Sequence, residues 1–315
     1  MIYKIQAKGI KIHINELFRD KRFVFQLGLA LGNKFWQKVY RRMLGLYCLC
    51  KGEITFEQYK QSFKNYQSRT FCLEEYLYKK LPSIYNLKHF KYFGHDFDFN
   101  EFSPRDAFSL LREIYLLDQY QARKFLKPDS TVIDAGAHYG SFSVLAANLS
   151  SKGKVFSFEP VEKTRRILQK NTEFYGNIEI VGAALGAKTA SGNISVGPHS
   201  NCNFVDDERL NANSNRYVDQ KVTIMALDDF VASNHIERLS FIKIDTEGYE
   251  RQVLLGAKKT IRKFRPVISM AAYHRPDDKI DLPKLIQEIQ PGYKYYWSKK
   301  GELDLICYFP TSRCP

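Results

Sequence analysis

The stretch Thr131-Val-Ile-Asp-Ala-Gly-Ala-His-Tyr-Gly140 joins an apolar run to a glycine-containing turn, and residues 141–148 that follow are typical of a helix. This order predicts a strand, a tight turn and a helix N-terminus, the arrangement that lets backbone approach a nucleotide-like ligand. Gly136 and Gly140 carry no Cβ atom that would block that approach. The stretch therefore predicts a ligand-binding turn in an α/β fold.

A second acidic residue follows the turn at a spacing that is typical of nucleotide-binding α/β folds. Residues 154–160, Lys-Val-Phe-Ser-Phe-Glu-Pro, predict a buried strand, and Glu159 lies 19 residues beyond Gly140. Open α/β sheets place the carboxylate that binds a ribose hydroxyl pair at about this distance. The spacing Asp-x-Gly-x-x-x-Gly does not match the Gly-x-Gly-x-x-Gly pattern of nicotinamide cofactors. Asp134 and Glu159 together favour S-adenosylmethionine as the ligand.

Helices and strands alternate from about residue 106 onward. The predicted elements are helix 112–126, strand 131–134, helix 141–150, strand 154–159, helix 161–174, strand 177–181, a polar insert to about residue 220, strand 221–226, helix 227–234, strand 239–245, helix 249–263, strand 266–272, helix 282–289 and a hairpin of strands 293–297 and 303–309. This order predicts a Rossmann-like, mostly parallel sheet covered on both faces, with an antiparallel strand at its C-terminal edge.

The N-terminal part of the chain differs from the rest in charge. Residues 1–100 carry 18 Lys and Arg against 8 Asp and Glu, whereas residues 101–315 carry 30 against 26. We predict a basic, mainly helical accessory region over residues 1–85 and an α/β domain over residues 86–315. An acidic partner should meet the accessory region.

One segment of the accessory region has the pattern of an amphipathic basic helix. Its apolar stripe comprises Trp36, Val39, Tyr40, Met43 and Tyr47, and its basic residues Lys34, Lys38, Arg41 and Arg42 lie mostly off that stripe. One interpretation is peripheral docking on an anionic membrane surface. The other is a helix packed on the α/β domain with a solvated basic face.

Composition favours a cytoplasmic protein. No apolar run approaches the roughly 18 residues needed to span a bilayer, and the first residues do not resemble a secretory signal. The six cysteines form no Cys-x-x-Cys pair, which favours free thiols. Around residues 89–99, aromatic residues alternate with His and Asp residues, which predicts short strands and not a metal site.

A second dense signal lies at residues 239–250, Leu-Ser-Phe-Ile-Lys-Ile-Asp-Thr-Glu-Gly-Tyr-Glu. A buried strand here delivers Asp245 and Glu247 at its C-terminal end, the edge where open α/β sheets bind ligands. Two carboxylates at that position destabilise the fold unless they are paired with other groups or take part in binding or catalysis.

Taken together, these motifs resemble the FkbM family of S-adenosylmethionine-dependent methyltransferases. The resemblance extends over about residues 110–310, and its segments are 113–120, 132–140, 156–160, 242–250, 253–257 and 273–278. Asn is common in the family where His138 stands here. The resemblance implies an O-methyltransferase whose acceptor is a sugar hydroxyl of a surface glycan, or of its nucleotide- or lipid-linked precursor, or a natural product.

The resemblance also implies which residues bind the cofactor. Asp134, Gly136, Ala137, His138 and Gly140 would form the turn at its methionine end. Glu159, followed by Pro160, would bind the ribose, Tyr120 would cover the pocket, Ala183 and Ala184 would border the adenine, and Asp245 would orient the cofactor.

Three side chains are candidates for the general base that removes the hydroxyl proton: Asp245, His274 and Glu247. Each has an alternative role, since Asp245 can orient the cofactor, Glu247 can bind the next helix start, and His274 can lie outside the reacting centre. A divalent cation would find ligands in these three residues with Asp277 or Asp278, but the spacing does not demand a metal and we predict none.

Two other functions compete with glycan or natural-product methylation. The basic N-terminal region is compatible with RNA methylation, but the sequence has no Asn-Pro-Pro-Tyr-like motif and no recognisable RNA-binding module, so a nucleic acid partner is not expected. A catalytically inactive Rossmann-like scaffold is the other alternative, and the intact set of Asp134, Gly136 and Glu159 argues against it.

Overall fold

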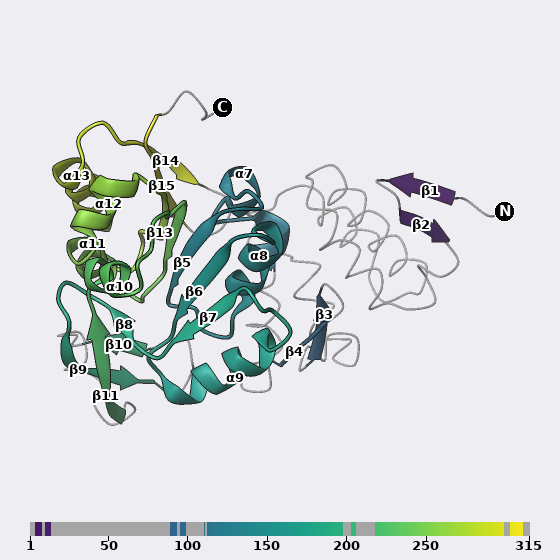
Figure 1. Ribbon diagram of the computed structural model, residues 1–315, viewed down its shortest axis with the longest axis horizontal. Helices are drawn as coiled ribbons and strands as arrows, with labels where there is room; N and C mark the ends of the chain where they lie inside the picture. Colours follow the sequence, from purple (N-terminus) through teal and green to yellow (C-terminus); the bar gives the residue numbers. More distant parts are fainter. Residues whose placement is uncertain are drawn as a thin grey trace, which may run out of the picture. The chain divides into compact units, whose positions relative to one another are not determined.

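The computed structural model describes residues 110, 112–197, 218–298 and 303–310, together with the backbone of short strands at 4–7, 10–13, 89–92, 95–98 and 203–205 (Figure 1). The chain forms two compact units, Met1–Leu117 and Asp118–Pro315. The predicted basic helix around Trp36 lies outside the described residues, and the predicted domain boundary near residue 85 stays a prediction.

The described part of the first unit consists of two antiparallel hairpins and a π-helix. Strand β1 (Lys4–Ala7) pairs with β2 (Ile10–His13), and β3 (His89–Tyr92) pairs with β4 (His95–Asp98). The short strands predicted around residues 89–99 are thus confirmed. The π-helix η1 spans Arg112–Leu117.

The single helix predicted over residues 112–126 is wrong. The backbone takes left-handed φ angles of 51° at Asp118 and 59° at Gln121, and only then does the short helix α7 (Ala122–Phe125) begin. A right-handed helix cannot continue through residues in that conformation. The Asp118 carboxylate accepts a hydrogen bond from the backbone N–H of Arg123 at 3.3 Å, which replaces a helical bond at the start of α7.

The second unit is built on a seven-stranded sheet of order β14-β15-β13-β12-β5-β6-β7 (Figure 1). Its strands are β5 (Thr131–Ala135), β6 (Lys154–Phe158), β7 (Ile178–Val181), β12 (Phe241–Ile244), β13 (Val267–Ala271), β14 (Lys294–Ser298) and β15 (Asp304–Tyr308). The strands from β13 to β7 pair in parallel, as predicted for a Rossmann-like sheet. The predicted C-terminal hairpin is confirmed as β14 and β15. Strand β15 pairs antiparallel with β13, and β14 pairs antiparallel with β15 at the edge of the sheet.

Helices cover the two faces of this sheet. Helix α8 (Ser141–Leu149) and α9 (Glu162–Thr172) follow β5 and β6, while α10 (Leu227–Ser233), α11 (Glu250–Leu255), α12 (Lys258–Phe264) and α13 (Asp278–Ile289) gather on the side opposite α8 (Figure 1). The main apolar core lies between the sheet and α10–α13. Among the described residues, no helix is both long enough and apolar enough to cross a bilayer.

The helix predicted over residues 249–263 is two helices. It breaks at Gly256 and Ala257, where a Cβ on Gly256 would lie 1.9 Å from the carbonyl oxygen of Gly186. The Asp228 carboxylate then accepts hydrogen bonds from the backbone N–H groups of Lys259 and Thr260 at the start of α12. A contact between distant segments therefore ends one helix, and a distant carboxylate caps the next.

The predicted polar insert contains strands of a second sheet. Its order is β10-β9-β11-β8, with β8 (Ala184–Leu185), β9 (Ala190–Val196), β10 (Asn203–Val205) and β11 (Val218–Met225). The strand predicted at 221–226 is confirmed as β11, but it belongs to this second sheet and not to the main one.

Candidate active site

The turn after β5 is held by backbone contacts to the neighbouring strands. The N–H groups of Gly136 and Ala137 donate to the carbonyl oxygen of Phe158 at 3.2 and 2.9 Å. Gly136 has a φ of 77°, and a Cβ there would lie 1.9 Å from the carbonyl oxygen of Asp245. Only glycine fits this position, because both the backbone angle and the close approach exclude a side chain.

The end of the same turn is also left-handed. His138 has a φ of 51°, and Gly140, which precedes α8, has a φ of 85°. A Cβ on Gly140 would lie 2.6 Å from Cδ1 of Leu168. The imidazole of His138 stacks on the ring of Tyr139, with centroids 4.3 Å apart. This places the turn tightly at the N-terminus of α8, as predicted.

Asp134 lies beneath the turn and is fully buried. Its Oδ2 accepts a hydrogen bond from the Ser143 hydroxyl at 2.6 Å, and its Oδ1 lies 3.2 Å from Nζ of Lys243. Lys243 also donates to the carbonyl oxygen of Gly136 at 2.7 Å. Asp134 therefore fixes the turn through Lys243, and its predicted contact with a cofactor stays a prediction.

Glu159 connects the end of β6 to the turn. Its Oε2 accepts a hydrogen bond from the backbone N–H of His138, and its Oε1 accepts one from Val161, both at 3.0 Å. Burial raises the pKa of Glu159 to about 7, although the two backbone donors act in the opposite direction. A carboxylate so buried gains from further hydroxyl donors, such as the ribose pair predicted for it.

Tyr120 reaches the end of β12. Its hydroxyl donates to Oδ2 of Asp245 at 2.6 Å, and its ring stacks edge-on against Phe142. Burial and the charge of Asp245 raise the pKa of Tyr120 well above its usual value, so the phenol keeps its proton. The family resemblance implied that both residues lie at the cofactor pocket, which stays a prediction, and the structure brings the two side chains into direct contact.

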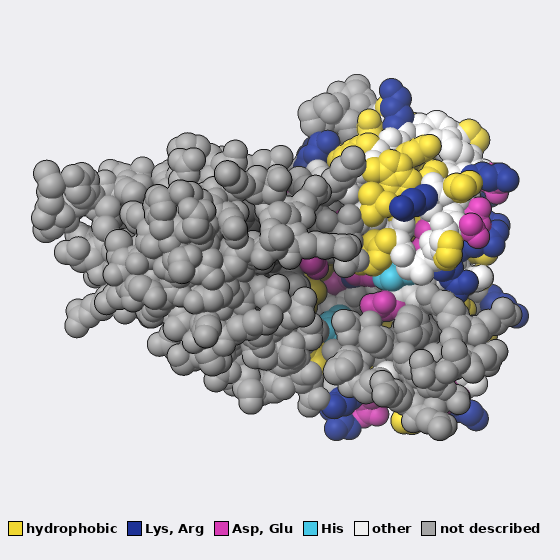
Figure 2. All heavy atoms as spheres, turned by 180° about the vertical axis from the view of Figure 1, so that it is seen from behind, with side chains coloured by type: hydrophobic (Ala, Val, Ile, Leu, Met, Phe, Trp, Pro, Cys, Tyr) yellow, Lys and Arg dark blue, Asp and Glu magenta, His cyan; other side chains and the backbone are white. Residues whose placement is uncertain are grey.

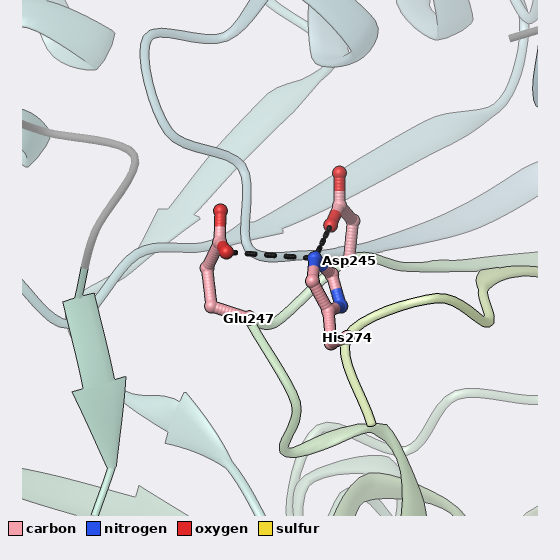
Figure 3. A group of neighbouring side chains, drawn as sticks. All are labelled: Asp245, Glu247 and His274. Atoms are coloured by element: carbon pink, nitrogen blue, oxygen red, sulfur yellow. Dashed lines mark ion pairs between the residues drawn. The ribbon is translucent and has the colours of Figure 1, made fainter. Parts of the chain in front are cut away.

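Three side chains converge beyond the turn: Asp245 and Glu247 from the segment after β12, and His274 from the segment after β13 (Figure 3). Nε2 of His274 lies 3.7 Å from Oδ1 of Asp245 and 3.4 Å from Oε2 of Glu247. Figure 2 shows acidic and histidine side chains gathered on one face of the described part. The three residues predicted for catalysis therefore form one cluster.

Glu250, in the first turn of α11, supports this cluster from behind. It is 1% exposed, and its Oε1 lies 3.0 Å from Nδ1 of His274. The same oxygen accepts hydrogen bonds from the backbone N–H groups of Thr246 and Gly248. Glu250 thus has the role at the helix start that was considered for Glu247, and it also orients the imidazole.

The charges of the cluster shift its pKa values. Burial alone would lower the pKa of His274, but the hydrogen bond and charge of Glu250, with the charges of Asp245 and Glu247, raise it to about 9. Burial and the neighbouring Asp245 raise the pKa of Glu247 to about 8. Burial also opposes ionisation of Asp245, yet Lys243, His274 and the Tyr120 hydrogen bond hold its pKa below the usual value.

The remaining predicted residues lie around this centre. Pro160 follows Glu159, and its carbonyl oxygen accepts a hydrogen bond from Arg165. Ala183 and Ala184 are buried after β7. Asp278 accepts a hydrogen bond from the backbone N–H of Arg275 at 2.7 Å. Neither Asp277 nor Asp278 belongs to the cluster of Asp245, Glu247 and His274.

Sequence reasoning missed Lys243 and Glu250. Lys243 interrupts the apolar strand β12, and a lysine that is 4% exposed requires a partner, so its position was a usable signal. Glu250 stands inside a motif that was already recognised, as an acid in the first turn of a helix. Its contact with His274 joins two segments 24 residues apart, which sequence spacing does not reveal.

The model of the methyltransferase FkbM domain matches residues 134–295, which include the turn, Glu159 and the whole cluster. The chain belongs to the FkbM methyltransferase family. This confirms the resemblance of the sequence motifs, and the seven-stranded sheet agrees with a methyltransferase of Rossmann-like fold.

Relatives of this FkbM domain carry names with different activities. The chain is 27% identical over 169 residues to the AMB antimetabolite synthetase AmbE of Pseudomonas aeruginosa, covering 42% of this chain and 8% of AmbE. It is also 27% identical over 164 residues to the hexuronic acid methyltransferase AglP of Haloferax volcanii, covering 51% of this chain and 62% of AglP. The chain thus spans less than two thirds of the length of either relative.

A solved FkbM methyltransferase, from Methylobacillus flagellatus KT, is similar to this chain at 17% identity with a TM-score of 0.43. The match covers 74% of this chain and 60% of that one.

Proposed function

We propose that this FkbM-family chain is an S-adenosylmethionine-dependent O-methyltransferase that methylates a sugar hydroxyl of a surface glycan or of its nucleotide- or lipid-linked precursor. The observation that carries the proposal is the contact between the glycine turn and the acidic cluster. Gly136 lies so close to the carbonyl oxygen of Asp245 that a Cβ atom would not fit. A methyl donor bound at the turn would therefore lie beside groups able to handle a proton.

The cofactor site is proposed from the residues around the turn. Gly136 and Gly140 let the turn pack against Asp245 and Leu168, and the methionine end would bind at this turn. The buried Glu159 carboxylate would accept hydrogen bonds from the ribose hydroxyl pair. Tyr120, which is hydrogen-bonded to Asp245, would cover the cofactor pocket. Ala183 and Ala184 would border the adenine, because they follow β7 at the ligand-binding edge of the sheet.

The chemistry asks little of the protein beyond alignment and removal of one proton. The acceptor oxygen attacks the methyl carbon, the carbon–sulfur bond breaks, and its electron pair stays on sulfur to give S-adenosylhomocysteine. Alignment of the reacting atoms supplies up to about 7–11 kcal/mol, whereas a general base contributes about 10²–10⁴-fold. The hydroxyl proton passes to the cluster, in which Asp245 is the candidate acceptor, because its pKa is held below the usual value, whereas a pKa of about 9 keeps His274 protonated at neutral pH.

The sugar acceptor is supported by the similarity to the hexuronic acid methyltransferase AglP. The similarity to the antimetabolite synthetase AmbE supports a second candidate, the hydroxyl of a natural product. Both acceptors need the same cofactor site and the same cluster, so they differ only in the group that the surrounding segments bind.

An acceptor screen tests the proposal. The purified chain is incubated with methyl-labelled S-adenosylmethionine and with nucleotide-linked hexoses and hexuronic acids, glycolipids and hydroxylated small molecules, and labelled products are identified by mass spectrometry. We expect transfer to a sugar hydroxyl, with losses of at least tenfold in Asp245→Asn and none in Glu237→Gln, an exposed acid outside the site. Transfer to a nitrogen or to RNA, or equal activity in Asp245→Asn, would contradict it.

A further inference from the structure

The cluster of Asp245, Glu247 and His274 has the composition of a cation site as well as that of an acid–base site. One oxygen from each carboxylate and one imidazole nitrogen lie within 4.8 Å of one another. The carboxylates and the imidazole point toward a common region in Figure 3. No other group of three or more His, Cys, Asp or Glu side chains among the described residues has this arrangement.

We propose that Asp245, Glu247 and His274 bind a divalent cation of the Mn²⁺ type. Ligand atoms bound to one ion at about 2.1 Å, with angles of 90–109°, lie about 3.0–3.4 Å apart. The His274 nitrogen lies 3.4 Å from the Glu247 oxygen and 3.7 Å from the Asp245 oxygen. The two carboxylate oxygens lie within 4.8 Å of each other, so binding of one ion requires the carboxylates to move closer together.

A second observation that favours a metal site is the contact of His274 with Glu250, a residue that is not one of the three proposed ligands. Glu250 holds Nδ1 of the imidazole at 3.0 Å, and its own position is fixed by the backbone N–H groups of Thr246 and Gly248. Metal-binding histidines typically have such a carboxylate on the far nitrogen, because it fixes the tautomer and aims the other nitrogen at the metal. Here that arrangement aims Nε2 toward Asp245 and Glu247.

Charge and access also favour a cation. Three carboxylates, those of Asp245, Glu247 and Glu250, surround one imidazole, while the nearby Lys243 ammonium is bound to Asp134 and to Gly136. The side chains of Asp245 and Glu247 are 24% and 32% exposed, whereas that of His274 is 10% exposed. An ion can thus enter from the carboxylate side and keep positions for other ligands there. Two oxygens and one nitrogen suit Mn²⁺ better than softer ions.

The catalytic role of the ion, though not its binding, rests on the proposed function. A cation bound by three protein ligands has positions left for two neighbouring oxygen atoms of an acceptor, which favours a vicinal diol or a hydroxy acid such as a hexuronic acid. The ion would lower the pKa of the bound hydroxyl, and the proton would leave to water. Asp245 and His274 would then act as ligands of the ion in place of a general base.

The test measures Mn²⁺ binding to the full chain, free of any affinity tag, by electron paramagnetic resonance of the unbound ion. We expect one saturable site per chain in the wild type. Glu247→Gln and His274→Gln should weaken it by at least tenfold. Glu250→Gln, which removes the charge behind His274 and alters the bonds to Thr246 and Gly248, should weaken it by about 10–100-fold. Glu237→Gln is the matched control and should bind Mn²⁺ as the wild type does. Circular dichroism verifies that each variant is folded.

Titration with S-adenosylhomocysteine in parallel separates this inference from the proposed function. Binding of the nucleoside without a saturable Mn²⁺ site would overturn the cation site and leave the methyltransferase proposal intact. A Mn²⁺ site that persists unchanged in both Glu247→Gln and His274→Gln would also overturn it, because the ion would then lie elsewhere. Mn²⁺ binding that depends on these residues, without nucleoside binding, would support the cation site and contradict the proposed function.

Discussion

Gly136 and Asp245 hold the two halves of the candidate site together. A Cβ atom on Gly136 would lie 1.9 Å from the Asp245 carbonyl oxygen, although the two residues are more than 100 positions apart in the chain. The loops after β5 and β12 therefore meet backbone to backbone. As a result, the segment at the end of β12 lies directly beside the turn.

This contact predicts the effect of Gly136→Ala. Alanine at a φ of 77° is strained by about 1–3 kcal/mol, and the clash with a backbone oxygen adds about 1–3 kcal/mol. Denaturant unfolding should therefore show a loss of about 2–6 kcal/mol. Gly176→Ala is the control, since a Cβ there would meet nothing within 4 Å. Equal stability of the two variants would contradict the packing described here.

The buried pair of Asp134 and Lys243 predicts a double-mutant effect. Lys243→Met leaves the Asp134 carboxylate buried without its cation, which costs about 3–5 kcal/mol. Adding Asp134→Asn removes the stranded charge, so the double variant should regain part of that stability. Chemical denaturation of the wild type, both single variants and the double variant measures the coupling. Additive losses would show that the pair does not act as a unit.

The raised pKa of Glu159 predicts a pH-dependent stability. Because its pKa rises from 4.5 to about 7 on folding, the folded state favours the protonated form, and this contribution is lost as the pH rises from about 4.5 through 7. The loss amounts to about 3 kcal/mol above pH 7. The unfolding free energy of Glu159→Gln relative to that of the wild type should thus increase between pH 5 and pH 8. An unchanged difference across this range would refute the assignment.

The hydrogen bond from Tyr120 to Asp245 predicts the effect of Tyr120→Phe. A hydrogen bond to a charged group contributes about 1.5–3 kcal/mol, so its loss should lower both stability and methyl transfer. Tyr175→Phe, which removes a partly exposed hydroxyl that contacts the neutral Asn148, should have a smaller effect of about 1 kcal/mol. Thermal unfolding and the methyl-transfer rate of both variants compare the two positions.

Much of the main sheet could be predicted from the sequence, because its central strands are short apolar runs buried on both faces. The bounds predicted for β5, β6 and β7 agree with the structure to within one residue. The glycine turn and the acid after β6 were also visible, since both follow directly from a strand. Local sequence patterns were therefore sufficient to predict features that depend on residues close together in the chain.

The remaining features depend on contacts between distant segments. The break after α11 arises from Gly186 against Gly256, and the second sheet arises when β11 pairs with β9 instead of joining the main sheet. The pairing of Lys243 with Asp134 crosses from β12 to β5. Sequence spacing predicted that Asp245, Glu247 and His274 share one edge, but not that Glu250 would orient the imidazole.

Titration calorimetry with S-adenosylhomocysteine tests the central claim most directly, because the claim requires a nucleoside site beside the cluster. The wild type, Glu159→Gln and the control Glu173→Gln, an exposed acid at the end of α9, are compared at pH 8. We predict micromolar binding to the wild type and the control, weakened at least tenfold, or about 1.4 kcal/mol, in Glu159→Gln. Absence of binding to the wild type, or equal binding by all three proteins, would contradict the cofactor site proposed for this chain.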